Sequence, residues 1–266
     1  MHTIGFDGQD TVRDMVDRAK ELGFDTIGIS NHFIVNPIIK STRMYHYSVI
    51  GGYSNIYSDS FDVVTAKFIQ HYDEIAKIQS ENKKIKILRG MEVDFFNDVK
   101  WRDGFERCLA ILKPDYLIGS CHLIEYDNTL LNSHDWKNAD TITQDVLLKK
   151  YWTNIINAAQ SGIFTWMAHL DLPKKVSLGL DEKWAAYENR AMDAIRKSGV
   201  AMEINTSFYK SGINEPYPSE RILNMAHDVP VLISDDAHAA KQIGRYFDNA
   251  CDLLNKYKLS QFQFEK

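Results

Sequence analysis

Cysteine is scarce in this chain of 266 residues, with only three, Cys108, Cys121 and Cys251, odd in number and widely spaced. Such a set does not suit a disulfide framework, so we interpret the three side chains as reduced thiols of a cytoplasmic protein. No apolar run approaches the length of a membrane span, and the opening MHTIGFDGQD is unlike a signal peptide. The sequence therefore predicts no membrane partner.

An excess of positive charge is also missing. The net charge is −5, which disfavours nucleic acid as the main partner. A glycine-rich phosphate loop is absent as well, because Gly5, Gly8 and the pair Gly51–Gly52 lack the required spacing and context. No repeat or linker marks a domain boundary, so we expect a single domain over residues 1–266. These absences narrow the class of protein without deciding its function.

What is present is an alternation of two hydrophobic periodicities along the whole chain. Helical spacing covers residues 11–22, about 60–80, 103–112, about 141–160, about 182–198, 219 to about 227 and about 239–256. Strand-like runs are TIGIS (26–30), KILRGMEVDFF (86–96), DYLIGSCHLI (115–124), FTWMAHL (164–170), VAMEINTS (200–207) and VPVLISDDAH (229–238). Such alternation predicts a parallel sheet with helices outside it. A closed barrel and an open doubly wound sheet both satisfy the pattern, and the missing phosphate loop favours the barrel.

Metal-ligand residue types fall where these strands end. The strand-end residues are His32, Glu92, His122, His169, Asp236 and His238, and His2 opens the chain before a loop that contains Asp7. In a barrel of parallel strands the carboxyl ends meet on one face, where active sites form. Imidazole together with carboxylate suits zinc, manganese or iron. The joint pattern predicts a transition-metal centre.

Each of these residues also has an ordinary interpretation. A histidine beside an apolar strand is commonly a hydrogen-bonded core or rim group, and Glu92 or Asp236 could pair with a cation. In the immediate segments RGMEVDFF and SDDAH, however, Arg89 is the one lysine or arginine, and a buried charge needs a partner or a metal. The other histidines are interpreted as solvent-side: His46, His71, His134 and His227.

Other catalytic arrangements fit less well. No G-x-S-x-G motif is present, which disfavours a serine hydrolase. Cys121 and His122 are adjacent on a strand and so point to opposite faces, which disfavours a Cys–His nucleophile. We therefore interpret Cys121 as a buried packing residue.

With these residues in place, the chain resembles the PHP (polymerase and histidinol phosphatase) family, and within it the monofunctional histidinol-phosphate phosphatases. The matching segments are residues 2–32, RGMEVDFF, DYLIGSCH, MAHLDL, EINTS and SDDAH, in the family's order. The resemblance implies a distorted (β/α)7 TIM-like barrel of PHP type and two to three divalent transition-metal ions (Zn, Mn or Fe). The ligands it implies are His2, Asp7, His32, Glu92, His122, His169, Asp236 and His238.

The resemblance also implies metal-assisted hydrolysis of a small phosphate monoester, L-histidinol phosphate, to L-histidinol and phosphate in histidine biosynthesis. Glu92 would bridge two metals, and Glu92 and Asp236 would hold the metal-bound hydroxide. Tyr-rich segment 42–59 is expected to be an ordered loop that acts as a substrate lid. Candidate substrate-binding residues are Arg43 in that segment, Asp94, Lys174, Lys175 and Lys210.

Two alternatives to this activity stay open. One is a PHP-type phosphoesterase for another small ester, such as a nucleotide or sugar phosphate. The other is a metal-poor, non-catalytic barrel that serves as a binding module. Metal content separates the second alternative from the enzymes, and a substrate panel separates the two enzymes.

The chain departs from the family pattern at two positions. The family opens with His-x-His on its first strand, whereas here His2 follows Met1 and no strand precedes it. We expect that the start lies a few residues upstream, with Met1 as the middle residue of the pair, or else that one metal is bound weakly. The second departure is Asn31, which stands directly before His32, where the family often has an aspartate. We expect this change to alter a hydrogen bond that supports a metal ligand and to leave the ligand set itself unchanged.

Overall fold

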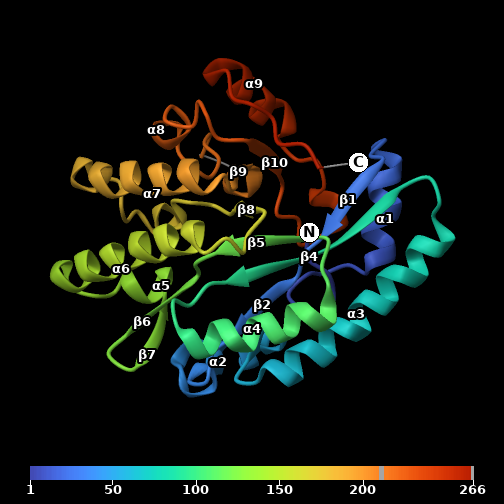
Figure 1. Ribbon diagram of the computed structural model, residues 1–266, viewed down its shortest axis with the longest axis horizontal. Helices are drawn as coiled ribbons and strands as arrows, with labels where there is room; N and C mark the ends of the chain where they lie inside the picture. The colour runs from blue at the N-terminus through green and yellow to red at the C-terminus, as the bar shows by residue number, and fades with distance from the viewer. Residues whose placement is uncertain (210–212, 265–266) are drawn as a thin grey trace. The chain divides into compact units, whose positions relative to one another are not determined.

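The computed structural model describes residues 1–209 and 213–264 (Figure 1). The chain divides into two compact units, residues 1–118 with 237–243 and residues 119–236 with 244–266. Strand β5 (Tyr116–Ser120) contributes residues to both. Within the described ranges, no helix has both the length and the apolar character needed to cross a membrane.

In the first unit, parallel strands surround β4. Strands β1 (Thr26–Ile29) and β2 (His32–Val35) pair one after the other with β4 (Lys86–Asp94), and β3 (Tyr57–Ser58) pairs with β2. On the other side of β4 lies β5. The helices of this unit are α1 (Val12–Glu21), α2 (Arg43–Ile50), α3 (Phe61–Glu81) and α4 (Val99–Leu112). Helices α3 and α4 lie side by side (Figure 1).

Local sequence explains the elements that hold this unit together. Thr11 caps α1 in a capping box with Asp14, and the apolar face that begins at Val12 is buried. On the strands, a Cβ at Gly90 would lie 2.2 Å from Cζ of Tyr116, and one at Gly28 would lie 2.2 Å from its hydroxyl. The two glycines therefore make room for the buried Tyr116 ring between β1, β4 and β5.

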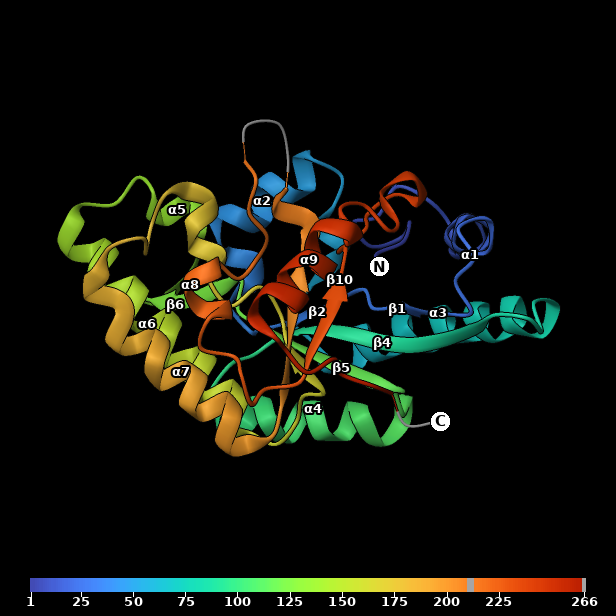
Figure 2. The ribbon, with the colours of Figure 1, turned by 90° about the horizontal axis from the view of Figure 1, so that it is seen from above.

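The second unit repeats the parallel arrangement. Strands β8 (Trp166–Met167) and β10 (Val231–Ser234) pair on either side of β9 (Ala201–Asn205), and β8 neighbours β5. Helices α6 (Thr141–Gln160) and α7 (Ala185–Ser198) lie side by side (Figures 1 and 2), and α9 (Phe247–Tyr257) lies against β10. The smaller elements are the hairpin β6 (Leu123–Tyr126) and β7 (Thr129–Asn132), α5 (Ser133–Trp136) and α8 (Glu220–Leu223).

The predicted α/β class with a parallel sheet and helices is confirmed, and several predicted bounds are wrong. The run DYLIGSCHLI is two strands, β5 and β6, separated at residues 121–122. Segment 42–59 is not a loop, since it contains α2, a 3-10 turn and β3. Helix α9 begins at Phe247 rather than near 239, after a 3-10 turn at Ala240–Gln242. The expectation of one single domain stays a prediction.

The buried position predicted for Cys121 is confirmed. Cys108 and Cys121 are buried and Cys251 is exposed, and no disulfide forms in the described part of the chain, which includes all three.

Candidate metal centre

The first unit brings together five of the predicted ligands. His32 opens β2 directly beside Glu92 on β4, because the two residues are partners in the parallel register. His2 is fixed through its main chain, whose N–H donates to the carbonyl of Ala237 at 2.8 Å. His238 follows Ala237, and its carbonyl accepts from Gln9 at 2.7 Å. The first residues of the chain and the segment at residues 237–238 therefore lie together.

Asp7 reaches this place through a tight loop. The N–H of Gly8 donates to the carbonyl of Thr3 at 3.2 Å, which folds residues 4–8 back onto the segment that carries His2. A Cβ at position 8 would lie 2.5 Å from the main-chain carbon of His2, so only glycine allows this approach. The loop thereby places the Asp7 carboxylate beside the ring of His2.

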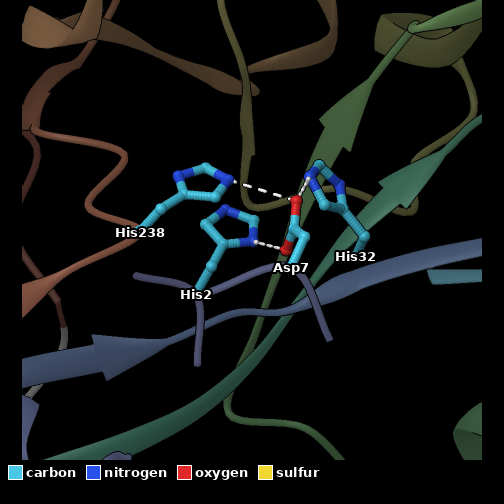
Figure 3. Close-up of side chains that lie close together, drawn as sticks. All are labelled: His2, Asp7, His32 and His238. Carbon is cyan, nitrogen blue, oxygen red and sulfur yellow. Dashed lines mark hydrogen bonds and ion pairs between the residues drawn. The ribbon is translucent and has the colours of Figure 1, made fainter. Parts of the chain in front are cut away.

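Three imidazoles converge on the Asp7 carboxylate (Figure 3). Oδ1 lies 3.3 Å from His2 Nδ1, and Oδ2 lies 3.2 Å from Nε2 of both His32 and His238. The other carboxylate, Glu92, has its Oε2 at 3.1 Å from His2 Nε2 and 3.6 Å from His32 Nδ1. His2 is thus flanked by two carboxylates, and its ring stacks on that of His238 with 4.2 Å between centroids.

The electrostatics of the cluster favour a cation. Burial by itself would raise the pKa of Asp7, but the imidazoles of His32 and His2, with hydrogen bonds from His2 and His238, outweigh it and hold that pKa well below its usual range. Burial works to lower the pKa of His32, and the carboxylates of Asp7 and Glu92 outweigh it, so that pKa is raised. Asp7 therefore stays ionised although its side chain is partly buried.

The donor set fits a transition metal. One atom each from His2, Asp7, His32 and His238 can be chosen so that all four lie within 4.8 Å of one another. Two ligand atoms on a tetrahedral zinc ion, each about 2.0–2.1 Å from it, stand about 3.4 Å apart. The 3.2–3.3 Å contacts between Asp7 and the three rings are close to that spacing. Imidazole nitrogens with carboxylate oxygens are also the donors that zinc, manganese and iron prefer.

With this geometry established, comparison with known proteins identifies the family. Residues 1–207 match the PHP domain model. The chain belongs to the PHP domain family. Its sequence is 27% identical over 188 residues to a probable histidinol-phosphatase of Deinococcus radiodurans, across 68% of this chain and 69% of that one. It is 23% identical over 301 aligned positions to the histidinol-phosphatase of Saccharomyces cerevisiae, across 97% of this chain and 86% of that one.

Two solved structures share the fold. One is a putative histidinol phosphatase from Listeria monocytogenes, with a TM-score of 0.70, 17% identity, and coverage of 94% of this chain and 98% of that one. The other is histidinol phosphate phosphatase from Lactococcus lactis in complex with zinc, L-histidinol and phosphate, with a TM-score of 0.73 and 18% identity. This second match covers 98% of this chain and 93% of that one. At these identities the likeness establishes the PHP fold of the chain.

The second unit holds the remaining predicted ligands of this PHP domain. The rings of His122 and His169 lie edge to face, with centroids 4.8 Å apart. His169 has φ +22° and Asp236 has φ +47°, a backbone region that side chains other than glycine rarely adopt. Such strain is typical of functional sites. Metal binding by these three residues stays a prediction.

Glu203 is a buried residue next to the predicted ligand His169 that the sequence interpretation missed. Its side chain is 3% exposed. Oε1 accepts from the main-chain N–H of His169 at 3.1 Å and from the amide of Asn205 at 2.8 Å, and Oε2 accepts from Trp166 at 3.2 Å and Ser234 at 2.9 Å. The strained His169 is thus fixed by a carboxylate on β9. In the sequence, a glutamate inside the apolar run VAMEINTS was the available signal.

We expect Glu203→Gln to lower the free energy of unfolding by about 2–4 kcal/mol. The amide NH₂ cannot accept, so two of the four donors that face Glu203 lose their acceptor. Urea denaturation of the chelated protein would measure the change. Glu125→Gln, an exposed glutamate on β6, is the matched control and should change stability by less than about 0.5 kcal/mol. Equal stability of Glu203→Gln and wild type would contradict this assignment.

The predicted substrate-binding residues lie in different surroundings. Lys174 is buried, and its ammonium group contacts Asp171 at 3.3 Å and Glu215 at 3.2 Å and donates to the carbonyl of Pro216. The positive charge of Lys174 is therefore paired with carboxylates of the protein itself. Lys175 is exposed, and the exposed Arg43 donates to the Tyr47 hydroxyl at 2.7 Å within α2. Asp94 is buried on β4, and Lys210 lies outside the described residues. Substrate contact by any of these residues stays a prediction.

The interpretation of His71 as a solvent-side residue is wrong, whereas His46, His134 and His227 are exposed as expected. His71 is 6% exposed on α3. Its position follows Val64 and Phe68 and precedes Ile75 and Ile78 at spacings of three and four, so it lies on the buried stripe. That spacing was visible in the sequence and could have located it.

Proposed function

We propose that this PHP-domain chain is a metal-dependent phosphatase that hydrolyses L-histidinol phosphate to L-histidinol and phosphate. The observation that carries the proposal is the convergence of His2, His32 and His238 on Asp7 beside Glu92, in a chain of this family. Two curated relatives are named histidinol-phosphatase, and a protein of the same fold was solved with zinc, L-histidinol and phosphate. A cytoplasmic location and a role in histidine biosynthesis are part of the proposal.

The residues of the first unit would hold the metal. Two to three divalent ions (Zn, Mn or Fe) are proposed, with His2, Asp7, His32, Glu92 and His238 among the ligands. When bound, such ions supply Lewis acidity to phosphoryl oxygens and lower the pKa of the attacking water. The predicted ligands His122, His169 and Asp236 are retained in the proposal as further ligands.

The side chains of the chain would prepare this chemistry in two ways. Asp7 holds His32 and His238 with one oxygen and His2 with the other, which fixes ring directions before a metal arrives. Asp94 lies two residues beyond Glu92 on β4, and therefore on the same strand face. We propose that its carboxylate contacts a positive group of the histidinol part of the substrate.

A panel of phosphate esters tests the proposal. The protein, purified without chelator and loaded with Zn²⁺ or Mn²⁺, would be assayed for phosphate release from L-histidinol phosphate, a hexose phosphate and a nucleoside monophosphate. We expect kcat/KM for L-histidinol phosphate to exceed the others by at least about 100-fold, because a site that binds a charged imidazole-bearing alcohol rejects esters without those groups. Preference for another ester would reassign the substrate. Release from none, with metal bound, would indicate a non-catalytic barrel.

A further inference from the structure

One buried residue connects the main chains that carry three of the candidate ligands. Asn31 immediately precedes His32, and its main-chain carbonyl accepts from the main-chain N–H of Glu92 at 3.0 Å. Its Oδ1 accepts from the main-chain N–H of Thr3, the residue after His2, at 2.8 Å. Asn31 has 0% of its surface exposed. The directions from which His2, His32 and Glu92 approach one another therefore depend on how Asn31 is held.

The orientation of the Asn31 amide follows from its partners. A main-chain N–H can only donate, so the atom that faces Thr3 N must be Oδ1. Nδ2 then points to the hydroxyl of Thr3 at 2.9 Å and to Nε2 of His71, also at 2.9 Å. Since Nδ2 donates, Nε2 of His71 must accept. His71 is therefore neutral here, with its hydrogen on Nδ1.

The surroundings of His71 suit the neutral ring. It packs against Phe6 at 5.3 Å, Phe68 at 6.4 Å and Tyr72 at 6.2 Å between ring centroids. Burial, and to a lesser extent the positive charge of Lys67, lower the pKa of His71 to about 4. Nε2 thus remains an acceptor at neutral pH.

We propose that His71 is a positioning residue of the metal centre, which acts through Asn31. By accepting from Nδ2 it keeps Oδ1 directed at Thr3 and so aligns the segment of His2 with those of His32 and Glu92. Without this acceptor, one buried amide hydrogen loses its partner, and the amide can turn to regain one. Turning would release the Thr3 main chain and move His2 relative to β2 and β4. The inference rests on the proposed function only in that both concern the same metal site.

Zn²⁺ affinity of the purified 266-residue chain, measured by competition with a chelating dye and without substrate, tests this role. His71→Leu removes the acceptor and keeps the bulk, and we expect Zn²⁺ binding to weaken about 10- to 100-fold, as is typical for residues that support metal ligands. His71→Gln places an amide oxygen near the position of Nε2, and we expect affinity within about threefold of wild type, by the same hydrogen-bond argument. His71→Asn is too short to reach Asn31 and should behave like His71→Leu.

Tyr72→Phe is the matched control. It lies next to His71 on α3, is similarly buried, and loses a hydrogen bond from its hydroxyl to the carbonyl of Gly90 at 3.1 Å. We expect it to lower the melting temperature of the chelated protein while Zn²⁺ affinity stays within about twofold, since Gly90 is not a ligand. Equal weakening of Zn²⁺ binding by Tyr72→Phe would show that affinity follows general stability, and would overturn the positioning role.

A double-mutant cycle tests whether His71 acts through Asn31. If it does, Asn31→Ala with His71→Leu should bind Zn²⁺ no more weakly than Asn31→Ala alone. Additive losses, a His71→Leu variant with wild-type affinity, or a His71→Gln variant as weak as His71→Leu would each overturn the inference. Failure of the phosphatase proposal would show itself differently, as wild-type protein that binds Zn²⁺ but releases no phosphate.

Discussion

Glu92→Gln is expected to lower kcat for L-histidinol phosphate by about 10²- to 10³-fold at saturating metal. The Glu92 carboxylate is buried, and its Oε2 contacts both His2 and His32. Glutamine keeps the shape but removes one negative charge and presents an NH₂ group or a weak acceptor to the same imidazoles. Metal that remains bound would then be held by one fewer anion, so both phosphate binding and water activation suffer. Single-turnover and steady-state phosphate release would measure the effect.

The control for this substitution must make the same chemical change elsewhere. Glu21→Gln, an exposed glutamate at the end of α1 that pairs with Arg18, serves that purpose and should leave kcat within about twofold. Circular dichroism would show whether Glu92→Gln remains folded. A folded Glu92→Gln enzyme with turnover within about a factor of two of wild type would remove Glu92 from the catalytic centre.

Much of the fold was visible in the sequence, because hydrophobic periodicity records which face of each element is buried. Helices α1, α3 and α6 lie within a residue or two of their predicted ranges. The predictions failed where tertiary contacts override local pattern. Strand β1 stops at Ile29 and β2 resumes at His32 along the same β4, and the interruption is set by main-chain bonds from Ser30 to Met1 and from Glu92 to Asn31. Contacts between residues so distant in sequence leave no periodic signal.

Segment 42–59 was mistaken for a loop for a different reason, because a local signal was overlooked. Its tyrosines and paired glycines resemble loop composition, yet Thr42 caps α2 by accepting from the N–H of Tyr45 at 3.2 Å. Thr42 could have predicted the start of α2, but the loop-like composition of the segment was given more weight.

The candidate site, like the fold, could be predicted from the sequence only in part. Residue type and strand-end position predicted His32, Glu92 and His238, and the family resemblance added His2 and Asp7. The structure brings these five residues together. The supporting residues Asn31, His71 and Glu203 were not predicted as a network, since their roles arise from which atom donates to which. Which atom donates and which accepts in these buried contacts depends on where the side chains lie in three dimensions, and the sequence does not record that.

Removal of metal is expected to abolish hydrolysis and to lower the melting temperature by about 5–10 °C, both reversed by Zn²⁺ or Mn²⁺. An ion that binds the folded chain at about 100 times its dissociation constant adds about 2.7 kcal/mol of stability. In a chain of this length each kcal/mol corresponds to roughly 2–4 °C. Without an ion, the carboxylate of Asp7 faces His32, whose raised pKa favours a proton on that ring. Thermal melts with chelator and with added metal would measure the shift.

The substitution Asp7→Asn tests whether the metal-induced rise in melting temperature comes from an ion bound by His2, Asp7, His32 and His238. Asp7 is the carboxylate on which His2, His32 and His238 converge, so its loss removes the charge that draws the cation and the acceptor that fixes the three rings (Figure 3). We expect the metal-induced rise in melting temperature to shrink to less than about 2 °C, because an affinity loss of about 100-fold cancels the 2.7 kcal/mol gained. Asp17→Asn, an exposed aspartate on α1, makes the same change without touching the cluster and should keep the full shift. A full shift in Asp7→Asn would mean that the stabilising ion binds elsewhere, and the loop closed by Gly8 would then have no part in metal binding.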